Sequence, residues 1–226
     1  MMYATYGSFM VGLDLGQAAD YSALAVVERV QVLPAGLSLG HWERHEDDHQ
    51  YLELVEEVRV RHLQRWELGT PYPAIVADVA SLMTSPQLRG AWLTFDRSGV
   101  GRGVGDLLKQ AYMAGRMGDN WPTGTTITGG AQSSAGNVPK RDLLTNVQIL
   151  LQQGRLKIAA GLALGETLER ELTSFRQKLS AAGRDSYDVA RREGEGHGDL
   201  VIAVALAARK ANPSVLPRLE ETEEAG

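Results

Sequence analysis

Apolar residues near the amino terminus gather in short runs that polar turns separate. The first run is Phe9–Leu15, after a start over 1–8 that has no period, and the second is Tyr21–Val30. Short apolar runs bounded by turn residues are typical of buried β-strands, and the short loop between these two favours a hairpin. A third strand is expected at Gly36–Glu43, after a turn of proline and glycine. The first part of the chain therefore predicts an antiparallel meander.

The spacing of apolar residues becomes helical over Asp48–Leu68, and charged residues fall between them. We therefore expect an amphipathic helix here, with its charged face in solvent. The apolar positions that share one stripe of this helix are Leu52, Val55, Val58, Leu63 and Trp66.

Strand and helix patterns alternate through the rest of the chain. Two apolar runs, Ala74–Val79 and Trp92–Asp96, compete for the next strand, and we favour the second because a glycine-rich turn and a helical pattern follow it. The run after Asp199 is apolar on every face and rich in alanine, which predicts a buried helix. The other expected elements are a strand at Thr125–Thr128, an extended piece at Leu156–Ala160, helices at Gly103–Ala114, Lys140–Gly154 and Leu164–Phe175, and a hairpin within Gln177–Arg191.

Composition narrows the class of protein. With 226 residues, 43% of them hydrophobic, the chain fits one globular domain, which we place at 9–212, between a flexible start at 1–8 and a disordered acidic tail at 213–226. No secretory signal and no long apolar span are present, so we expect neither export nor membrane insertion. Because there is no cysteine, any metal must be held by oxygen or imidazole, and oxygen favours magnesium or manganese.

Charge is less decisive than composition. The formal net charge of −5 argues mildly against a nucleic-acid binder. However, the excess of acidic residues lies in some segments of the chain, and most of the arginine and lysine residues from Arg97 onward lie in others. A basic face on an acidic chain therefore remains open, because net charge averages over all faces.

Three aspartates stand at the ends of expected elements. Asp14 lies within the first apolar strand, near its end, Asp96 follows a later strand, and Asp199 opens the buried helix. Each has an ordinary explanation as a turn or helix-cap residue. A carboxylate among apolar neighbours is nevertheless costly without a compensating cation, and several such groups together can hold two metal ions about 4 Å apart for displacement at phosphorus. Spacing alone leaves both interpretations open.

Six short motifs follow one another along the chain: Gly12–Gly16, Asp96–Gly101, Ile127–Gly130, Val138–Leu143, Gly154–Ile158 and His197–Val201. Taken in this order, they resemble the nuclease domain of the large terminase subunits of tailed phages. No single motif is specific, and the resemblance depends on their order over about 12–208. It implies an α/β fold of the ribonuclease H-like type, with a five-stranded mixed sheet of three antiparallel and two parallel strands flanked by helices.

The resemblance also implies a function and a site. The function is that of a metal-dependent endonuclease that cuts concatemeric viral DNA during genome packaging, in the cytoplasm of the host bacterium. Asp14 would bridge two divalent cations, Mg²⁺ or Mn²⁺, while Asp96 and Asp199 would each hold one. Water activated at one ion would attack the phosphate, and the other ion would stabilise the leaving 3′ oxygen.

The resemblance also assigns roles to other residues, each of which has an ordinary structural explanation as well. Lys140 matches a lysine that family members place at the start of this helix, where it would contact the DNA backbone, although a solvated lysine is the more common case. His197 would assist at the site, or be an ordinary partly buried histidine. The full set of DNA-binding candidates is Arg97, Arg102, Lys140 and Arg141.

The implied partners are double-stranded DNA, a packaging ATPase, the portal and the small terminase subunit. The sequence contains no G-x-x-x-x-G-K-[ST] phosphate loop, so this chain is not expected to be the motor, which would be a fused domain or a separate chain. Gly198 stands where many relatives carry a second aspartate, so the second metal would bind more weakly. The role of Asp78, in the competing apolar run, is left open.

Three alternatives remain. One is another ribonuclease H-like nuclease, such as a junction resolvase. Another is a non-catalytic DNA-binding or scaffold module of the same fold. The last is a fragment of an actin-type or sugar-kinase-type phosphotransferase, because Gly12–Gly16 also resembles the phosphate-binding strand of those enzymes; however, Gln17–Ala19 lacks their usual hydroxyl residues, and the chain has room for only one of the two domains they need.

Overall fold

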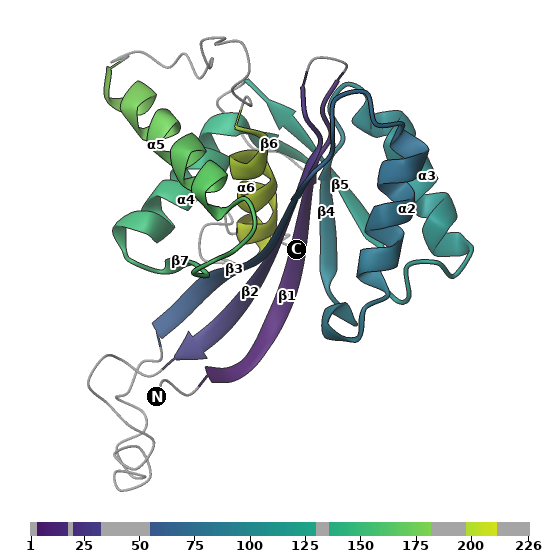
Figure 1. The fold of residues 1–226 in the computed structure, drawn as a ribbon, viewed down its shortest axis with the longest axis horizontal. Helices are drawn as coiled ribbons and strands as arrows, with labels where there is room; N and C mark the ends of the chain where they lie inside the picture. Colours follow the sequence, from purple (N-terminus) through teal and green to yellow (C-terminus); the bar gives the residue numbers. More distant parts are fainter. Residues whose placement is uncertain (1–3, 18–19, 33–54, 130–135, 182–197, 212–226) are drawn as a thin grey trace, which may run out of the picture.

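A computed structural model describes residues 4–17, 20–32, 55–129, 136–181 and 198–211. They form a seven-stranded mixed sheet in the order β6-β5-β4-β1-β2-β3-β7, with helices against both faces (Figure 1). The strands are β1 Ala4–Asp14, β2 Ala23–Val32, β3 Val55–Arg65, β4 Trp92–Asp96, β5 Pro122–Thr128, β6 Asn137–Pro139 and β7 Leu156–Ile158. The helices are α2 Tyr72–Met83, the short 3₁₀ helix Pro86–Leu88, α3 Gly101–Met113, α4 Lys140–Gln152, α5 Gly165–Ala181 and α6 Asp199–Ala211.

The central five strands confirm the predicted ribonuclease H-like fold class. β1, β2 and β3 form an antiparallel meander, and β4 and β5 run parallel to β1 on its other side. The expected count of five strands is too low, because β6 and β7 add one short strand to each edge of the sheet. Each of these strands has three residues. β7 lies within the extended piece expected at Leu156–Ala160, whereas β6 is too short for an apolar run to reveal it.

The helix predicted over Asp48–Leu68 is wrong, because its described part contains β3. Val58, Val60 and Leu63 are the buried apolar residues of this strand, and a register shift in its pairing with β2 interrupts strict alternation. The resulting spacing mimics a helix. The charged residues of β3 are not a solvated helix face either, since they form ion pairs across the sheet, such as the pair between Glu56 and Arg29.

Other expectations met different outcomes. β1 begins at Ala4, so part of the stretch 1–8 that was expected to be loose is a strand. The choice of Trp92–Asp96 over Ala74–Val79 is confirmed, because the second run lies in α2. The hairpin expected within Gln177–Arg191 conflicts with α5, which extends to Ala181. The predicted strand at Gly36–Glu43 and the acidic tail lie outside the described residues.

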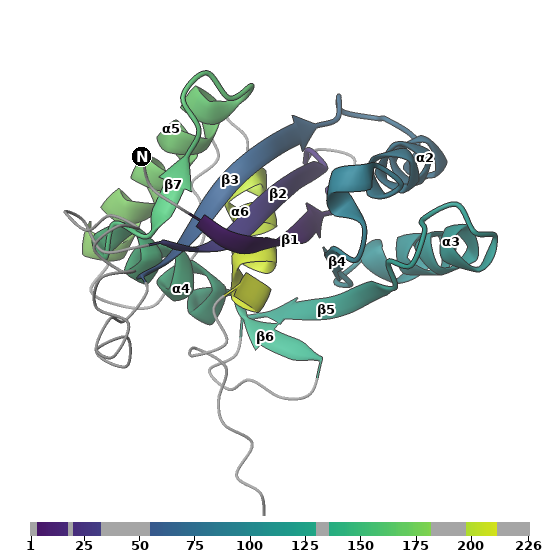
Figure 2. The same ribbon diagram turned by 90° about the horizontal axis from the view of Figure 1, so that it is seen from below.

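The sheet separates two apolar cores. One lies between the sheet and α4, α5 and α6 and contains Met10, whereas the other lies under α2 and α3 and contains Val11 and Leu13. This alternation places Gly12 on the α6 face of β1. Figure 2 shows α6 against the part of the sheet formed by β1 and β2. None of the helices in the described part of the chain is long and apolar enough to cross a membrane.

Gly12 allows α6 to approach β1 at backbone distance. A Cβ atom at this position would overlap the carbonyl oxygen of Ala203 and the amide nitrogen of Ala207, both in α6. These atoms belong to the helix backbone, so they cannot move aside as a flexible side chain could. The distance between α6 and the sheet is therefore set by the absence of a side chain at one position.

Gly12→Ala should lower the free energy of unfolding by about 3 kcal/mol, because the added methyl group overpacks this contact. Chemical denaturation monitored by circular dichroism would measure the change. The matched control is Gly103→Ala on α3, where a Cβ atom would meet nothing within 4 Å. That variant should gain about 0.5–1 kcal/mol from helix propensity. Equal stability of Gly12→Ala and the native chain would contradict the prediction.

Candidate metal centre

Asp14 and Asp96 lie side by side at one edge of the sheet. β1 and β4 are parallel, and Gly12 pairs with Thr94 and Leu13 with Phe95. Asp14 and Asp96 are the next residue of each strand, and both end their strands. In open α/β sheets, the carboxyl ends of parallel strands form the usual place for a ligand. The register of two strands therefore brings together two of the three predicted aspartates.

Asp199 reaches the same region from α6. It is the first residue of the helix and is 5% exposed. Asp14 lies two residues after Gly12, so it faces the side of the sheet on which α6 packs. The close contact between α6 and β1 thus places a third carboxylate next to the first.

The electrostatics of Asp14 show that the three groups are neighbours. Burial raises the pKa of the Asp14 carboxyl group well above its usual range, and the charges of Asp199 and Asp96 raise it further. Charges shift a neighbour in this way only over short distances. Asp14 keeps part of its surface open to solvent, so the cluster is accessible from outside.

Asp96 is held by the neighbouring strand. Its Oδ1 accepts a hydrogen bond from the amide of Ser98 at 2.8 Å and a longer one from the amide of Ile127 at 3.4 Å. The hydroxyl group of Ser98 also accepts from the Ile127 amide, at 3.0 Å. These contacts fix the Asp96 carboxylate relative to β5.

Two further charged groups act on Asp14. Lys140, the first residue of α4, lowers the pKa of Asp14, whereas Asp20, in the loop between β1 and β2, raises it. Sequence reasoning named Lys140 but missed Asp20, although the predicted hairpin would have placed that residue beside Asp14. Four carboxylates against one lysine give the region an excess of negative charge, which favours a bound cation.

The donor set suits a hard divalent cation, because it consists of carboxylate oxygens. Within the described residues, however, no group of three or more histidine, aspartate or glutamate side chains is arranged to hold one ion. Mg²⁺ is commonly bound by only one or two carboxylates, with waters and substrate phosphates completing its coordination. Asp14 and Asp96 form one pair of carboxylates at this site, and Asp14 and Asp199 form another. Each pair supplies the one or two carboxylates that Mg²⁺ commonly uses.

The other predicted site residues are distributed as follows. Arg97 and Arg102 are exposed, on the segment that joins β4 to α3 and in the first turn of α3. Arg97 donates a hydrogen bond to Thr126 at 3.4 Å. Arg141, in the first turn of α4, lies 3.7 Å from its neighbour Asp142. His197 lies outside the described residues.

Two questions left open by the sequence receive structural answers. Asp78 on α2 accepts a hydrogen bond from the indole of Trp66 at 2.8 Å, which gives it a structural role away from the aspartate cluster. Gly198 has a φ of +84°, a conformation that glycine adopts without strain. This backbone conformation accounts for a glycine immediately before Asp199.

Glu171 is a buried carboxylate that sequence reasoning missed. It lies on α5, forms an ion pair with Arg65 at the end of β3, and accepts hydrogen bonds from the amides of Leu200 and Val201. Burial raises its pKa to about 7, although Arg65 and the Val201 amide lower it and Asp199 raises it. No local pattern signals this contact, because its partners come from elements far apart in the sequence.

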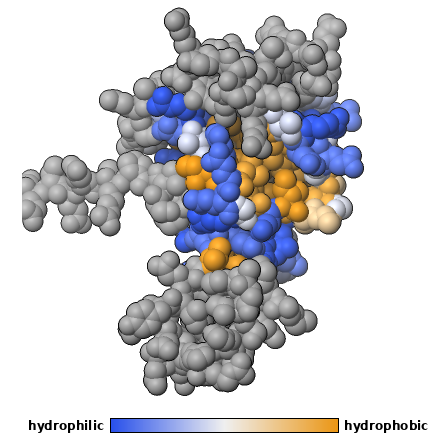
Figure 3. Space-filling view, turned by 90° about the vertical axis from the view of Figure 1, so that its left-hand side faces the viewer, coloured by the Kyte–Doolittle hydropathy of each residue, from blue (hydrophilic) through white to orange (hydrophobic). Residues whose placement is uncertain are grey.

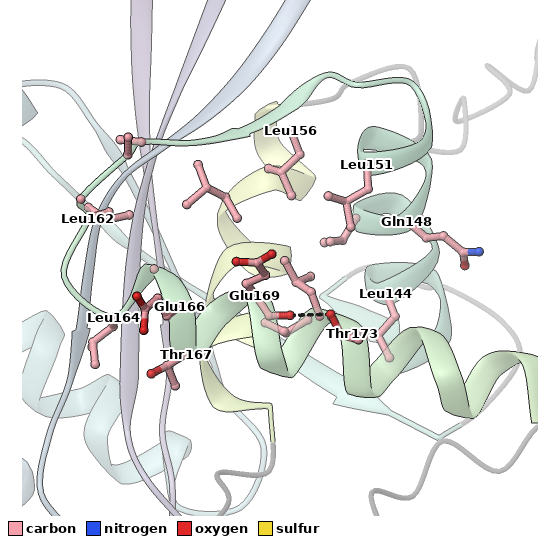
Figure 4. Close-up of a pocket in the computed structure, with 18 of the residues that line it drawn as sticks. Leu144, Gln148, Leu151, Leu156, Leu162, Leu164, Glu166, Thr167, Glu169 and Thr173 are labelled. Carbon is pink, nitrogen blue, oxygen red and sulfur yellow. Dashed lines mark hydrogen bonds between the residues drawn. The ribbon is translucent and has the colours of Figure 1, made fainter.

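A cavity of about 1200 Å³ lies near this site but does not contain the aspartates. It separates α4 from α5, and Figure 3 shows apolar surface within the hollow and polar surface around it. Leu144 and Leu151 on α4 face Glu169 and Thr173 on α5 (Figure 4). The Thr173 hydroxyl group donates to the Glu169 carbonyl oxygen, as expected inside a helix. The lining of the cavity includes two carboxylates, Glu166 and Glu169, but none of the three predicted aspartates.

Comparison with known proteins gave structural matches only. No protein-family profile and no curated protein sequence matches the chain. It is similar to the crystal structure of the large terminase nuclease from thermophilic phage G20c, at 22% identity and a TM-score of 0.49, over 90% of this chain and 82% of that one. It is also similar to the HK97 bacteriophage large terminase, at 13% identity and a TM-score of 0.47, over 92% of this chain but 40% of that one. Both structures are of the protein class that the sequence motifs resemble.

Without metal, the chain should lose stability as the pH rises from 4.5 through about 7. The Glu171 pKa rises from 4.5 to about 7 on folding, and that of Asp14 rises as well. The folded chain therefore binds more protons than the unfolded chain in this window, and stability falls as those protons are lost. Melting temperatures in chelator, at about pH 5 and about pH 8, would measure the change.

Asp14→Asn should melt at a higher temperature than the native chain at about pH 8 in chelator, because it removes a buried charge that faces other carboxylates. The difference should shrink as the pH falls, because the raised pKa of Asp14 lets the native carboxyl group take up a proton more readily in the folded chain. The control is Asp106→Asn on α3, whose side chain is 72% exposed. A lower melting temperature for Asp14→Asn than for the native chain at about pH 8 would contradict the prediction.

Proposed function

We propose that this chain is a DNA endonuclease that uses two divalent cations, Mg²⁺ or Mn²⁺, to hydrolyse phosphodiester bonds, and that it cuts viral DNA during genome packaging. The observation that carries the proposal is the buried Asp14 carboxyl group with the charges of Asp96 and Asp199 beside it. Such a cluster is unfavourable without cations. It also lies at the sheet edge where α/β proteins bind their ligands.

The chain's residues have distinct roles in this proposal. Asp14 would contact both ions, Asp96 one and Asp199 the other, so each ion would have a pair of carboxylates. When bound, the ions would supply activation of water and stabilisation of the leaving oxygen. The contacts of Asp96 with Ser98 and Ile127 hold its carboxylate in one orientation. Lys140 supplies positive charge beside Asp14, where a DNA phosphate would otherwise meet only carboxylates.

DNA would approach along the side of the site that carries Arg97 and Arg102. Both side chains are exposed; Arg97 follows directly after Asp96, and Arg102 lies in the first turn of α3. Arginines at such positions bind phosphate without regard to base sequence. By resemblance, the further partners would be a packaging ATPase, fused or separate, together with the portal and the small terminase subunit.

A non-catalytic DNA-binding module is the second candidate. The observation that favours it is the absence, among the described residues, of three side chains arranged around one ion. The two candidates can be distinguished by DNA cleavage. The nuclease cuts DNA and needs Asp14 and a divalent metal to do so, whereas the non-catalytic module leaves DNA intact.

The native chain should nick and linearise supercoiled plasmid with Mn²⁺ or Mg²⁺ and should be inactive in chelator. Asp14→Asn should reduce the cleavage rate by at least about 100-fold, because its side chain keeps the volume of aspartate but loses the charge that holds metal. Gel electrophoresis of plasmid over time would measure the rates. Asp106→Asn, which removes an exposed aspartate from α3, should cut at the native rate.

Two results would overturn the nuclease proposal. One is an Asp14→Asn variant that folds and cuts as fast as the native chain. The other is a native chain that does not cut with either metal. If DNA binding persists in the second case, the non-catalytic module becomes the better account of the fold.

Arg102→Ala should weaken DNA binding by a similar factor for unrelated sequences and lower the slope of log affinity against log salt by about 1, because one phosphate contact is lost. Fluorescence anisotropy in the Asp14→Asn background, which keeps the DNA intact, would measure both quantities. Arg170→Ala on α5 is the control, since Arg170 is exposed and donates hydrogen bonds to Glu166 and Thr167 of its own helix. An unchanged salt slope for Arg102→Ala would exclude a phosphate contact at this residue.

A further inference from the structure

The amino terminus of α6 has no side-chain cap of its own. Gly198 precedes the helix, and its carbonyl oxygen accepts the first helical hydrogen bond, from Ile202 at 2.9 Å. A residue in this position usually caps the next amides with a side-chain oxygen, but glycine has none. The amides of Leu200 and Val201 therefore need an acceptor from elsewhere, since both residues are buried.

Glu171 supplies that acceptor from a different helix. Its Oε2 accepts from the amide of Leu200 at 3.1 Å and from the amide of Val201 at 3.2 Å. Its Oε1 accepts from the guanidinium group of Arg65. Both carboxylate oxygens are therefore engaged, and the residue is 8% exposed. This arrangement caps α6 from α5 and leaves Glu171 without a free oxygen for a metal ion.

Arg65 fixes Glu171 in turn. It is the last residue of β3, and its guanidinium group lies over the ring of Tyr21, 5.0 Å from the ring centroid. A guanidinium group that contacts both a carboxylate and an aromatic face is restricted in orientation. The first turn of α6 is thus connected through Glu171 and Arg65 to the start of β2.

We propose that Glu171 is a positioning residue that holds the first turn of α6, and with it Asp199, in place for metal binding. Asp199 immediately precedes the two amides that Glu171 accepts from, so a shift of this turn would move its carboxylate. The inference rests on the proposed function, because it assigns Glu171 a part in the same metal site. Groups that orient a ligand commonly affect metal affinity by 10–100-fold, by order of magnitude.

Glu171→Gln is the test variant, because glutamine keeps the volume but places an amide group against the Arg65 donors. The matched control is Glu169→Gln, an exposed residue on the same helix. Amide hydrogen exchange of Leu200 and Val201, without metal, reports the cap directly. Mn²⁺ affinity, measured by isothermal titration calorimetry, reports the position of Asp199 without any need for catalysis.

In Glu171→Gln, the two amides should exchange about five-fold faster or more, and the Mn²⁺ dissociation constant should rise by about 10-fold or more. Glu169→Gln should change neither. Unchanged amide exchange would overturn the inference. Faster exchange with native Mn²⁺ affinity would overturn it as well, because Glu171 would then stabilise α6 without placing Asp199.

Asp14→Asn separates this inference from the proposed function. If the native chain binds Mn²⁺ and Asp14→Asn does not, the metal site exists and the Glu171 result decides the inference alone. If the native chain shows no Asp14-dependent binding of Mn²⁺, the proposed function fails and the role of Glu171 in metal binding fails with it. A Glu171→Gln variant that does not fold can be replaced by Arg65→Lys, which keeps the charge and loses the forked geometry of the guanidinium group.

Discussion

The arrangement of the site depends on the contact between the backbone of α6 and β1 at Gly12. With a side chain there, the helix would have to lie farther from the sheet. Because α6 lies so close, its first residue, Asp199, acts electrostatically on Asp14 at the end of β1. The parallel register of β1 and β4 then adds Asp96. One position without a Cβ atom thus underlies both the core on this face and the cluster of carboxylates.

The sequence predicted those elements whose signals are local. The β1–β2 hairpin, β4, α3, α4 and α6 were all expected, because each has a clear apolar run or helical spacing that ends at a turn residue. β3 was mistaken for a helix, since its spacing is altered by a register shift that only the pairing with β2 reveals. β7 lies within the extended piece expected at Leu156–Ala160, whereas β6 was not expected, because it is a three-residue strand that pairs with β5. Local pattern carries no information about such neighbours.

The residues of the candidate site also differ in whether the sequence alone could identify them. Asp14, Asp96 and Asp199 could be named in advance, since each ends or begins an element and stands out beside apolar residues. Asp20 was overlooked, although the predicted hairpin places it beside Asp14. Glu171 could not be named, because its effect comes from the packing of α5 against the cluster. The three aspartates of the cluster could therefore be identified from the sequence, whereas Glu171, which contacts the first turn of α6, could be identified only from the fold.

The order of these aspartates along the chain has a consequence for protein synthesis. Asp14 is on the first strand and Asp199 on the last described helix, so a ribosome has made most of the chain before the third carboxylate exists. α6 can pack against β1 only after that point. A nascent or truncated chain that ends before α6 thus lacks the complete cluster, and the activity proposed for it would arise only in the finished molecule.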